Sequence, residues 1–492
     1  MPYAFFHDDT PDMLETPLRV LKNHRFSLHP KKTFLPPIVF TLPFLLHTPA
    51  LIAIPLFHHL LGLGAVILVG LLCRLWFTHW KFYILPLTLL TAANPFLLWY
   101  EQTVMAETIF IFCTLLLAVA GTLYALDQNK AHLGFLAGSL FLVAGARPEG
   151  KLLFGFGLFL LVLLHWRDWR AAWPRFAMLL TLALATAILT KTAQTGLLLY
   201  TSVARMTPAT LKAAPGFDPY VADLRTQLQT RWQQTLDFPR VRERRLVAEA
   251  VERYLIDHGN TSEKSKRRQT GDAFCIKLAR ETCLHNLTAL PAHVYHKFRL
   301  TSLDAPSGRL DNEWLFEKQN WAYSGDMDLA TYLSQGLTGK RLETATDIKH
   351  FVDSHFQEVP WFNALQAHWL SVVNHWRFPD LRIPKPDAPR SFSVRYGVPF
   401  YFLAGALGLI VIGLRRGPLQ SFHIAWGLTL LAFFFTIILT ANIKPRFRLV
   451  FEPFWFIYAG LLIETVFLWL FRNAEVRRAI AASLHPAPLT PP

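Results

Sequence analysis

The fold is decided by stretches such as residues 107–125, which read ETIFIFCTLLLAVAGTLYA. After Glu107 this stretch carries no charged residue, and the next one is Asp127. About 20 consecutive apolar residues cross a bilayer as an α-helix. Similar uncharged stretches fill the first 200 and the last 100 of the 492 residues. We therefore predict an all-α polytopic membrane protein with about 9–10 transmembrane helices.

The composition agrees with a membrane protein and excludes two other classes. Hydrophobic residues make up 52% of the chain and charged residues 17%, and the mean hydropathy is +0.27. A soluble domain carries about a quarter charged residues, so neither a soluble globule nor a disordered chain is expected. The net charge of +15 fits Lys and Arg in cytoplasmic loops better than nucleic-acid binding, which we do not expect.

Hydropathy places nine spans along the chain. Residues 34–52 are rich in proline, which interrupts helices, and are expected to form a broken or interfacial helix. The nine spans are predicted at residues 55–73, 82–100, 107–125, 132–146, 150–165, 176–199, 397–414, 421–442 and 449–470.

The charges of the loops predict the orientation. Basic clusters follow residues 55–73, 150–165, 397–414 and 449–470, and the positive-inside rule makes that side cytoplasmic. The chain then divides into an outer catalytic loop, two membrane regions, an extracytoplasmic domain and a cytoplasmic tail. Their predicted bounds are residues 1–33 (outer loop), 34–199 and 397–471 (membrane), 200–396 (extracytoplasmic domain) and 472–492 (tail).

The block at residues 200–396 is predicted to be soluble and mainly helical. Residues 223–236 and 242–256 carry apolar residues three and four positions apart, which is typical of amphipathic helices. Cys275 and Cys283 lie in this block, where an oxidising compartment would allow a disulfide between them. Cys73 and Cys113 lie in apolar stretches and are expected to serve packing.

Two acidic sites lie on the predicted outer side. Asp8 and Asp9 follow each other near the start of the chain, in a segment that can also be a simple solvated turn. Glu101 and Glu107 are six residues apart, and Glu107 opens a span. An acid at that position can merely favour the N-terminus of a helix.

Two further sites on that side contain cations. Arg147, Glu149 and Lys151 separate two short spans, where they can pair and cap the helices or belong to a functional site. Lys444, Arg446 and Arg448 gather where the positive-inside rule leaves few cations. A lipid phosphate is the natural partner for such a cluster.

The order of these motifs resembles the GT-C superfamily of membrane glycosyltransferases. In particular, it is similar to dolichyl-phosphate-mannose protein mannosyltransferases and aminoarabinose lipid A transferases. The similarity lies in Asp8–Asp9, in the Lys-Thr-Phe-Leu-Pro-Pro of residues 32–37, in Glu107, in the Arg-Pro-Glu-Gly of residues 147–150 and in the Arg-Phe-Arg of residues 446–448, followed by Pro453. The family's tyrosine after the aspartate and its helix before the first loop have no counterpart here, and residues 200–396 show no match.

The resemblance implies transfer of a sugar from a polyprenyl-phosphate donor to a hydroxyl acceptor, with inversion, at the outer face of a bacterial plasma membrane. Asp9 or Asp8 would remove the hydroxyl proton, and Glu107 would position the acceptor or the base. Arg446, Arg448 and Lys444 would bind the phosphate, supported by Arg147, Glu149 and Glu101.

Three alternatives stay open at this point. Asp8, Asp9 and Glu107 could bind a divalent metal through their carboxylate oxygens; no other cofactor is expected. A flippase for lipid-linked sugars or another transporter would explain the spans and the charges near them. A scaffold without activity is the third reading.

Overall fold

The computed structural model describes most of the membrane region and part of the polar block. The described residues are 13, 16, 33–45, 50–77, 83–92, 97, 101, 106–189, 195–222, 241–259, 264–298, 392–415, 417–440 and 450–484. Over these ranges the chain is helical and has no strand, which confirms the all-α prediction for them.

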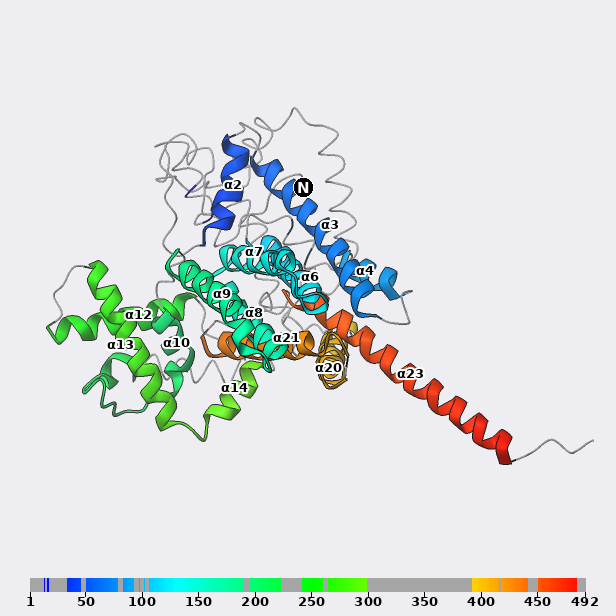
Figure 1. Cartoon of the computed structure of the whole chain (residues 1–492). Helices are drawn as coiled ribbons and strands as arrows, with labels where there is room; N and C mark the ends of the chain where they lie inside the picture. The colour runs from blue at the N-terminus through cyan, green and yellow to red at the C-terminus, as the bar shows by residue number, and fades with distance from the viewer. Residues whose placement is uncertain are drawn as a thin grey trace, which may run out of the picture.

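The apolar helices form one bundle (Figure 1). Its elements are α2 (Leu35–Leu45), α3 (Ala50–Trp76), α4 (Ile84–Ala92), α6 (Glu107–Leu126), α7 (Lys130–Ala146), the 3-10 helix η2 (Pro148–Leu153), α8 (Phe154–His165), α9 (Trp169–Leu189), α20 (Phe392–Leu414), α21 (Gln420–Thr440) and α23 (Glu452–Leu484). In Figure 1, α23 runs away from the bundle at one side, whereas the helices of the polar block lie at the other.

Within the described residues, four helices are long and apolar enough to cross a membrane. They are Ala53–Trp76, Glu107–Leu126, Pro148–His165 and Glu452–Phe471. Four further apolar stretches accompany them: Lys130–Ala146, and Ala172–Thr186, Phe402–Leu414 and Gln420–Thr436 within the longer helices α9, α20 and α21. Helices α20 (23 residues) and α21 (21 residues) cover most of the spans predicted at residues 397–414 and 421–442. The range predicted at 82–100 contains the nine-residue helix α4.

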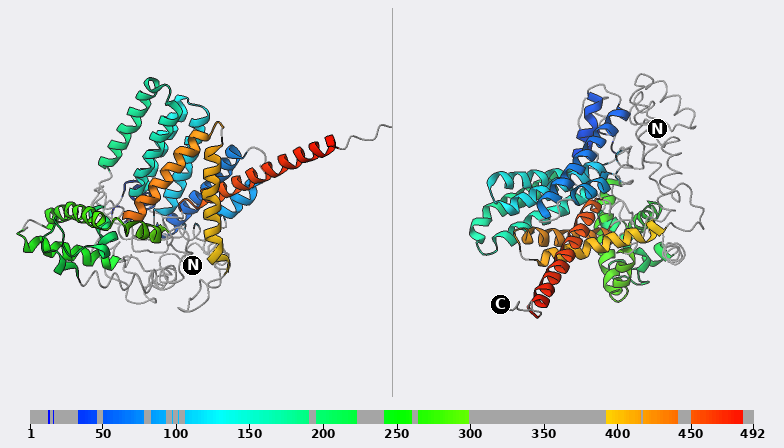
Figure 2. Two further views of the ribbon diagram at one scale, coloured as in Figure 1. Left: turned by 90° about the horizontal axis from the view of Figure 1, so that it is seen from below. Right: turned by 90° about the vertical axis from the view of Figure 1, so that its right-hand side faces the viewer.

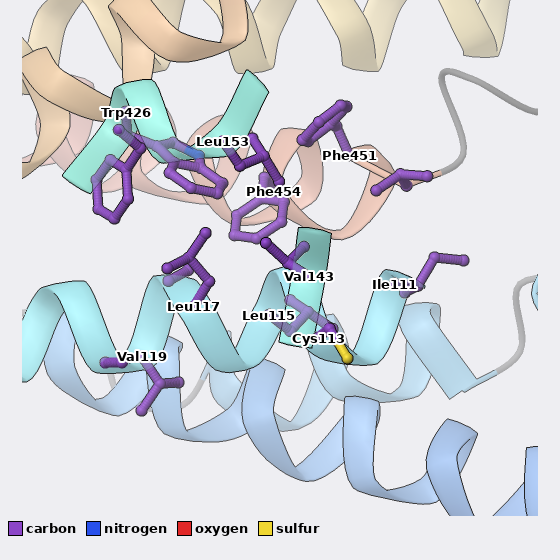
Figure 3. Close-up of a cluster of buried hydrophobic side chains, with 14 of the residues drawn as sticks. Ile111, Cys113, Leu115, Leu117, Val119, Val143, Leu153, Trp426, Phe451 and Phe454 are labelled. Carbon is purple, nitrogen blue, oxygen red and sulfur yellow. The ribbon is translucent and has the colours of Figure 1, made fainter. Parts of the chain in front are cut away.

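Helix α6 lies at the centre of the bundle. Most of its side chains are buried, and Figure 3 shows Leu117 extending toward Trp426 and Phe454, whereas Val119 extends from the opposite side of the helix. Cys113 packs in this core, as predicted for it and for Cys73. Two of the buried threonines of α6 bond within the helix: Thr114 Oγ1 donates to the carbonyl oxygen of Phe110 at 2.7 Å, and Thr122 Oγ1 donates to the carbonyl oxygen of Ala118 at 2.8 Å. An apolar helix can therefore carry these hydroxyls without leaving them unsatisfied.

Glycines allow α20 and α23 to approach closely. A Cβ atom at Gly405 would lie 2.7 Å from the carbonyl oxygen of Trp455. A Cβ atom at Gly408 would overlap the carbonyl oxygen of Tyr458. The later glycine of α20 contacts the later residue of α23, so the two helices run parallel. Small residues at helix crossings are a common packing device in membranes because lipid supplies no hydrophobic drive for helix association.

Several helix ends differ from the sequence prediction. Helix α3 begins at Ala50, five residues before Pro55, where a break was expected. The span predicted at 176–199 is replaced by α9, which begins at Trp169 and ends at Leu189, and by a separate helix that begins at Thr195. Helix α23 continues to Leu484, well beyond the expected end at residue 470.

The described part of the polar block forms a second helical unit. It comprises α10 (Thr195–Val203), η3 (Ala204–Met206), α12 (Val241–Asp257), α13 (Lys264–His285) and α14 (Leu290–Phe298). Helix α12 confirms the predicted amphipathic helix at 242–256, whereas residues 223–236 lie outside the description. Tyr200, Phe217 and Leu278 are among the residues that form its own apolar core. Figure 2 shows this unit beside the bundle, so the polar block has a core separate from that of the membrane helices.

Two features of this unit concern charge and sulfur. Glu281 accepts hydrogen bonds from the backbone N–H groups of Lys212 at 2.5 Å and Ala213 at 2.8 Å, which fixes the preceding loop to α13. Cys275 and Cys283 both lie on helix α13. Eight residues along one helix separate them by about 12 Å, too far for the disulfide that the sequence left open.

Candidate functional site: a buried cluster of charged residues

The junction between α7 and η2 places Arg147 inside the bundle. The residue before a proline avoids helical dihedral angles, and Arg147, before Pro148, is extended with φ −148° and ψ 152°. Helix α7 therefore ends at Ala146, and the next turn folds back along it. A Cβ atom at Gly150 would overlap the carbonyl oxygen of Val143, so this close return requires glycine.

Arg147 joins two carboxylates that are far apart in the sequence. Its Nη1 donates to Oε1 of Glu107 at 2.6 Å, and its Nε donates to Oε2 of Glu149 at 3.1 Å. The side chain of Glu107 is 2% exposed and that of Arg147 11%, whereas Glu149 reaches 27%. The guanidinium also lies 5.9 Å from the centre of the Phe110 ring. A charge this deeply buried is stable only with such partners.

This cluster brings together residues that the sequence treated as two sites. Glu107 was predicted to open a span, which the start of α6 confirms. Arg147 and Glu149 were expected either to pair and cap two helices or to belong to a functional site. The contact between Glu107 and Arg147 spans 40 residues and requires α6 and α7 to be antiparallel neighbours. Spacing in the sequence carries no signal for it.

A second polar pair lies at the same end of the bundle. His59 Nδ1 and Glu101 Oε2 are 2.6 Å apart, and a Cβ atom at Gly62 would overlap the Glu101 carboxylate. A Cβ atom at Gly64 would meet Phe112, and further along the helices Trp76 Nε1 donates to Thr122 Oγ1 at 3.0 Å. Helices α3 and α6 therefore run parallel, which brings His59 to the level of Glu107. The sequence analysis missed His59, whose only signal was a histidine pair inside an apolar stretch.

A third polar cluster marks the opposite end. Arg175 Nη1 donates to Nε2 of His165 at 2.8 Å and to the hydroxyl of Tyr124 at 3.3 Å. Along α6 this end lies about 25 Å from Glu107. The sequence analysis predicted that the loops at Glu107 and Arg147 lie on one side of the membrane and the loops at Asp127 and His165 on the other. In the structure, the first two loops lie at one end of the bundle and the other two at the opposite end.

The remaining predicted site residues lie outside the described part of the chain. They are Asp8, Asp9, Lys444, Arg446 and Arg448. The alternative of a divalent metal held by Asp8, Asp9 and Glu107 therefore stays a prediction. Within the described ranges, no group of three or more His, Cys, Asp or Glu side chains is arranged to hold a metal ion.

No protein-family model, curated protein or solved structure matches this chain.

Proposed function

We propose that the protein is a membrane glycosyltransferase that moves a sugar from a polyprenyl-phosphate donor to a hydroxyl acceptor, at the end of the bundle where Arg147 lies. The observation that carries the proposal is the buried contact between Glu107 and Arg147. Burying charged groups costs free energy, so a buried ion pair inside an apolar bundle favours a functional role. The order of acidic and basic motifs along the sequence favours sugar transfer in particular.

The contacts of Glu107 favour a positioning role for this carboxylate. Its Oε1 already accepts a short hydrogen bond from Arg147, and the side chain is buried. A carboxylate in that position holds the guanidinium in place. Asp9 or Asp8 is then the better candidate for the base that removes the proton of the acceptor hydroxyl.

The proposed step is a direct displacement. The acceptor oxygen attacks the anomeric carbon as its proton passes to the base, and the bond from that carbon to the phosphate oxygen breaks. The polyprenyl phosphate leaves with the electron pair, so negative charge grows on it in the transition state. Cations already in place at Lys444, Arg446 and Arg448 stabilise that charge more in the transition state than in the ground state. The displacement inverts the anomeric centre.

A transporter is the competing function. Transporters place substrate and ion sites near the bilayer midplane, on broken helices. Here Glu107, Arg147 and Glu149 gather where α6 begins and α7 ends. This position favours chemistry at the membrane surface, where an acceptor from the aqueous side can meet a lipid-linked donor.

The experiment is a transfer assay with radiolabelled polyprenyl-phosphate sugars and a membrane extract as the source of acceptors. Asp9→Asn should lower turnover by about 10²–10⁴-fold, because a positioned base supplies a factor of that size. Asp127→Asn, the same change at the opposite end of the bundle, serves as the control and should retain full turnover. Normal turnover in Asp8→Asn, in Asp9→Asn and in the double variant would exclude these residues as the base.

A further inference from the structure

Tryptophans are exposed between the end of α8 and the first turns of α9, at the end of the bundle opposite Arg147. The side chains of Trp166 and Trp173 are 67% and 55% exposed, and Trp169 lies between them in the sequence. Trp169 and Trp173 contact each other edge to face at 6.1 Å between ring centres. Tryptophan is costly to leave in bulk water, and it is enriched where a membrane meets water.

Arginines are interleaved with these rings. Arg167 lies with its Cζ 5.1 Å from the centre of the Trp166 ring, and Arg170 is exposed. Arg175 follows two residues after Trp173, and Asp168 is the only acid between residues 165 and 176. The segment therefore carries a net positive charge next to exposed aromatic surface.

The segment is fixed to the bundle rather than attached by its ends alone. Arg175 donates to both His165 and Tyr124, which belong to α8 and α6, and the backbone N–H of Asp168 donates to the carbonyl of His165 at 3.0 Å. Trp173 also stacks on Phe176 with ring centres 5.9 Å apart. The positions of the rings and cations are thus set by the same fold that sets the membrane helices.

We propose that this tryptophan–arginine segment, residues 165–176, binds the headgroups of anionic phospholipids. Its place supports this occupant, because it lies where the apolar helix that ends at His165 is followed by the first turns of α9. The rings would lie at headgroup level while Arg167 and Arg170 meet lipid phosphates. The positive charge of the segment attracts the net negative charge of an anionic headgroup, whereas a zwitterionic headgroup carries no net charge. This inference does not depend on the proposed sugar transfer.

Brominated lipids test the proposal, since bromine on an acyl chain quenches nearby tryptophan fluorescence. The full-length protein is placed in nanodiscs that contain a minor fraction of brominated phosphatidylglycerol or, separately, brominated phosphatidylcholine. The wild type should show stronger quenching by the anionic lipid. The excess should fall at high salt, which screens surface charges.

Variants assign the excess to this segment. Arg167→Gln with Arg170→Gln should lower the local enrichment of the anionic lipid by up to about 25-fold, since each surface cation contributes about a factor of five. Arg253→Gln with Arg280→Gln removes the same charge from the second helical unit and should leave the excess unchanged. Replacing Trp166, Trp169 and Trp173 with Phe should remove most of the excess signal.

Two results would overturn the proposal. One is equal quenching of the wild type by both brominated lipids. The other is an excess that the Arg167 and Arg170 changes leave intact, which would place the anionic lipid elsewhere on the protein. Both arginines are exposed, so their replacement with Gln leaves the packed core untouched.

Discussion

Replacing Arg147 with methionine should destabilise the bundle far more than an ordinary surface change. Methionine keeps much of the length and volume of the side chain but removes the donor to Glu107. The Glu107 side chain, 2% exposed, would lose its 2.6 Å charge-assisted hydrogen bond. Removing one partner of a buried pair typically costs about 3–5 kcal/mol, because the other charge stays buried.

The more exposed ion pair between Arg147 and Glu149 serves as the comparison for the loss of stability. Its carboxylate is 27% exposed and lies 3.1 Å from Arg147, so Glu149→Gln keeps an acceptor and should cost about 1 kcal/mol or less. The assay is unfolding of the purified protein in mixed micelles with increasing sodium dodecyl sulfate, followed by tryptophan fluorescence.

A double variant separates the buried charge from general damage. Adding Glu107→Gln to Arg147→Met neutralises the carboxylate, so the double variant should be less destabilised than the sum of the single changes by about 1–3 kcal/mol. Additive losses, or an Arg147→Met variant no less stable than Glu149→Gln, would refute the reasoning.

Three further predictions follow from close contacts and from charge. Gly408→Ala should destabilise the contact between α20 and α23 by about 1–3 kcal/mol, measured by the same unfolding assay, whereas Gly413→Ala, whose Cβ would lie 3.8 Å from its nearest neighbour, should be near neutral. Gly62→Ala should displace the Glu101 carboxylate from His59 and lower turnover as much as Glu101→Gln does, whereas Gly413→Ala should leave turnover unchanged. That result would place the His59–Glu101 pair in the site. Desolvation raises the pKa of Glu281, but the two backbone N–H groups outweigh it and hold the pKa below its ordinary value. The stabilisation by Glu281 is therefore present above pH about 4.5 and lost as the pH falls through the lowered pKa, so Glu281→Gln should flatten the acid side of the stability profile, and an unchanged profile would contradict this.

Helix positions were predictable where hydrophobicity alone decides them. The start of α6 at Glu107 follows from an acid before a long apolar stretch, and α12 follows from amphipathic spacing. The break at Arg147 follows from the proline after it. In each case the signal is local, and neighbouring helices do not change it.

The failures arise where neighbours decide. Residues 176–199 read as one apolar span, but α10 begins at Thr195 and packs into the core of the second unit, so the apolar residues there serve another core. Cys275 and Cys283 seemed able to pair only while their shared helix was unknown. The contact between Glu107 and Arg147 and the pair of His59 with Glu101 depend on which helices are adjacent, which periodicity does not encode.

The most direct test of the proposed sugar transfer is a mass balance in sealed liposomes. The reconstituted protein is given a polyprenyl-phosphate sugar in the bilayer and an acceptor fraction outside, and free polyprenyl phosphate is counted against intact donor. Sugar transfer predicts one free polyprenyl phosphate for each sugar that becomes attached to an acceptor. Intact donor that only changes leaflet, with no free polyprenyl phosphate, would contradict transfer and identify a transporter.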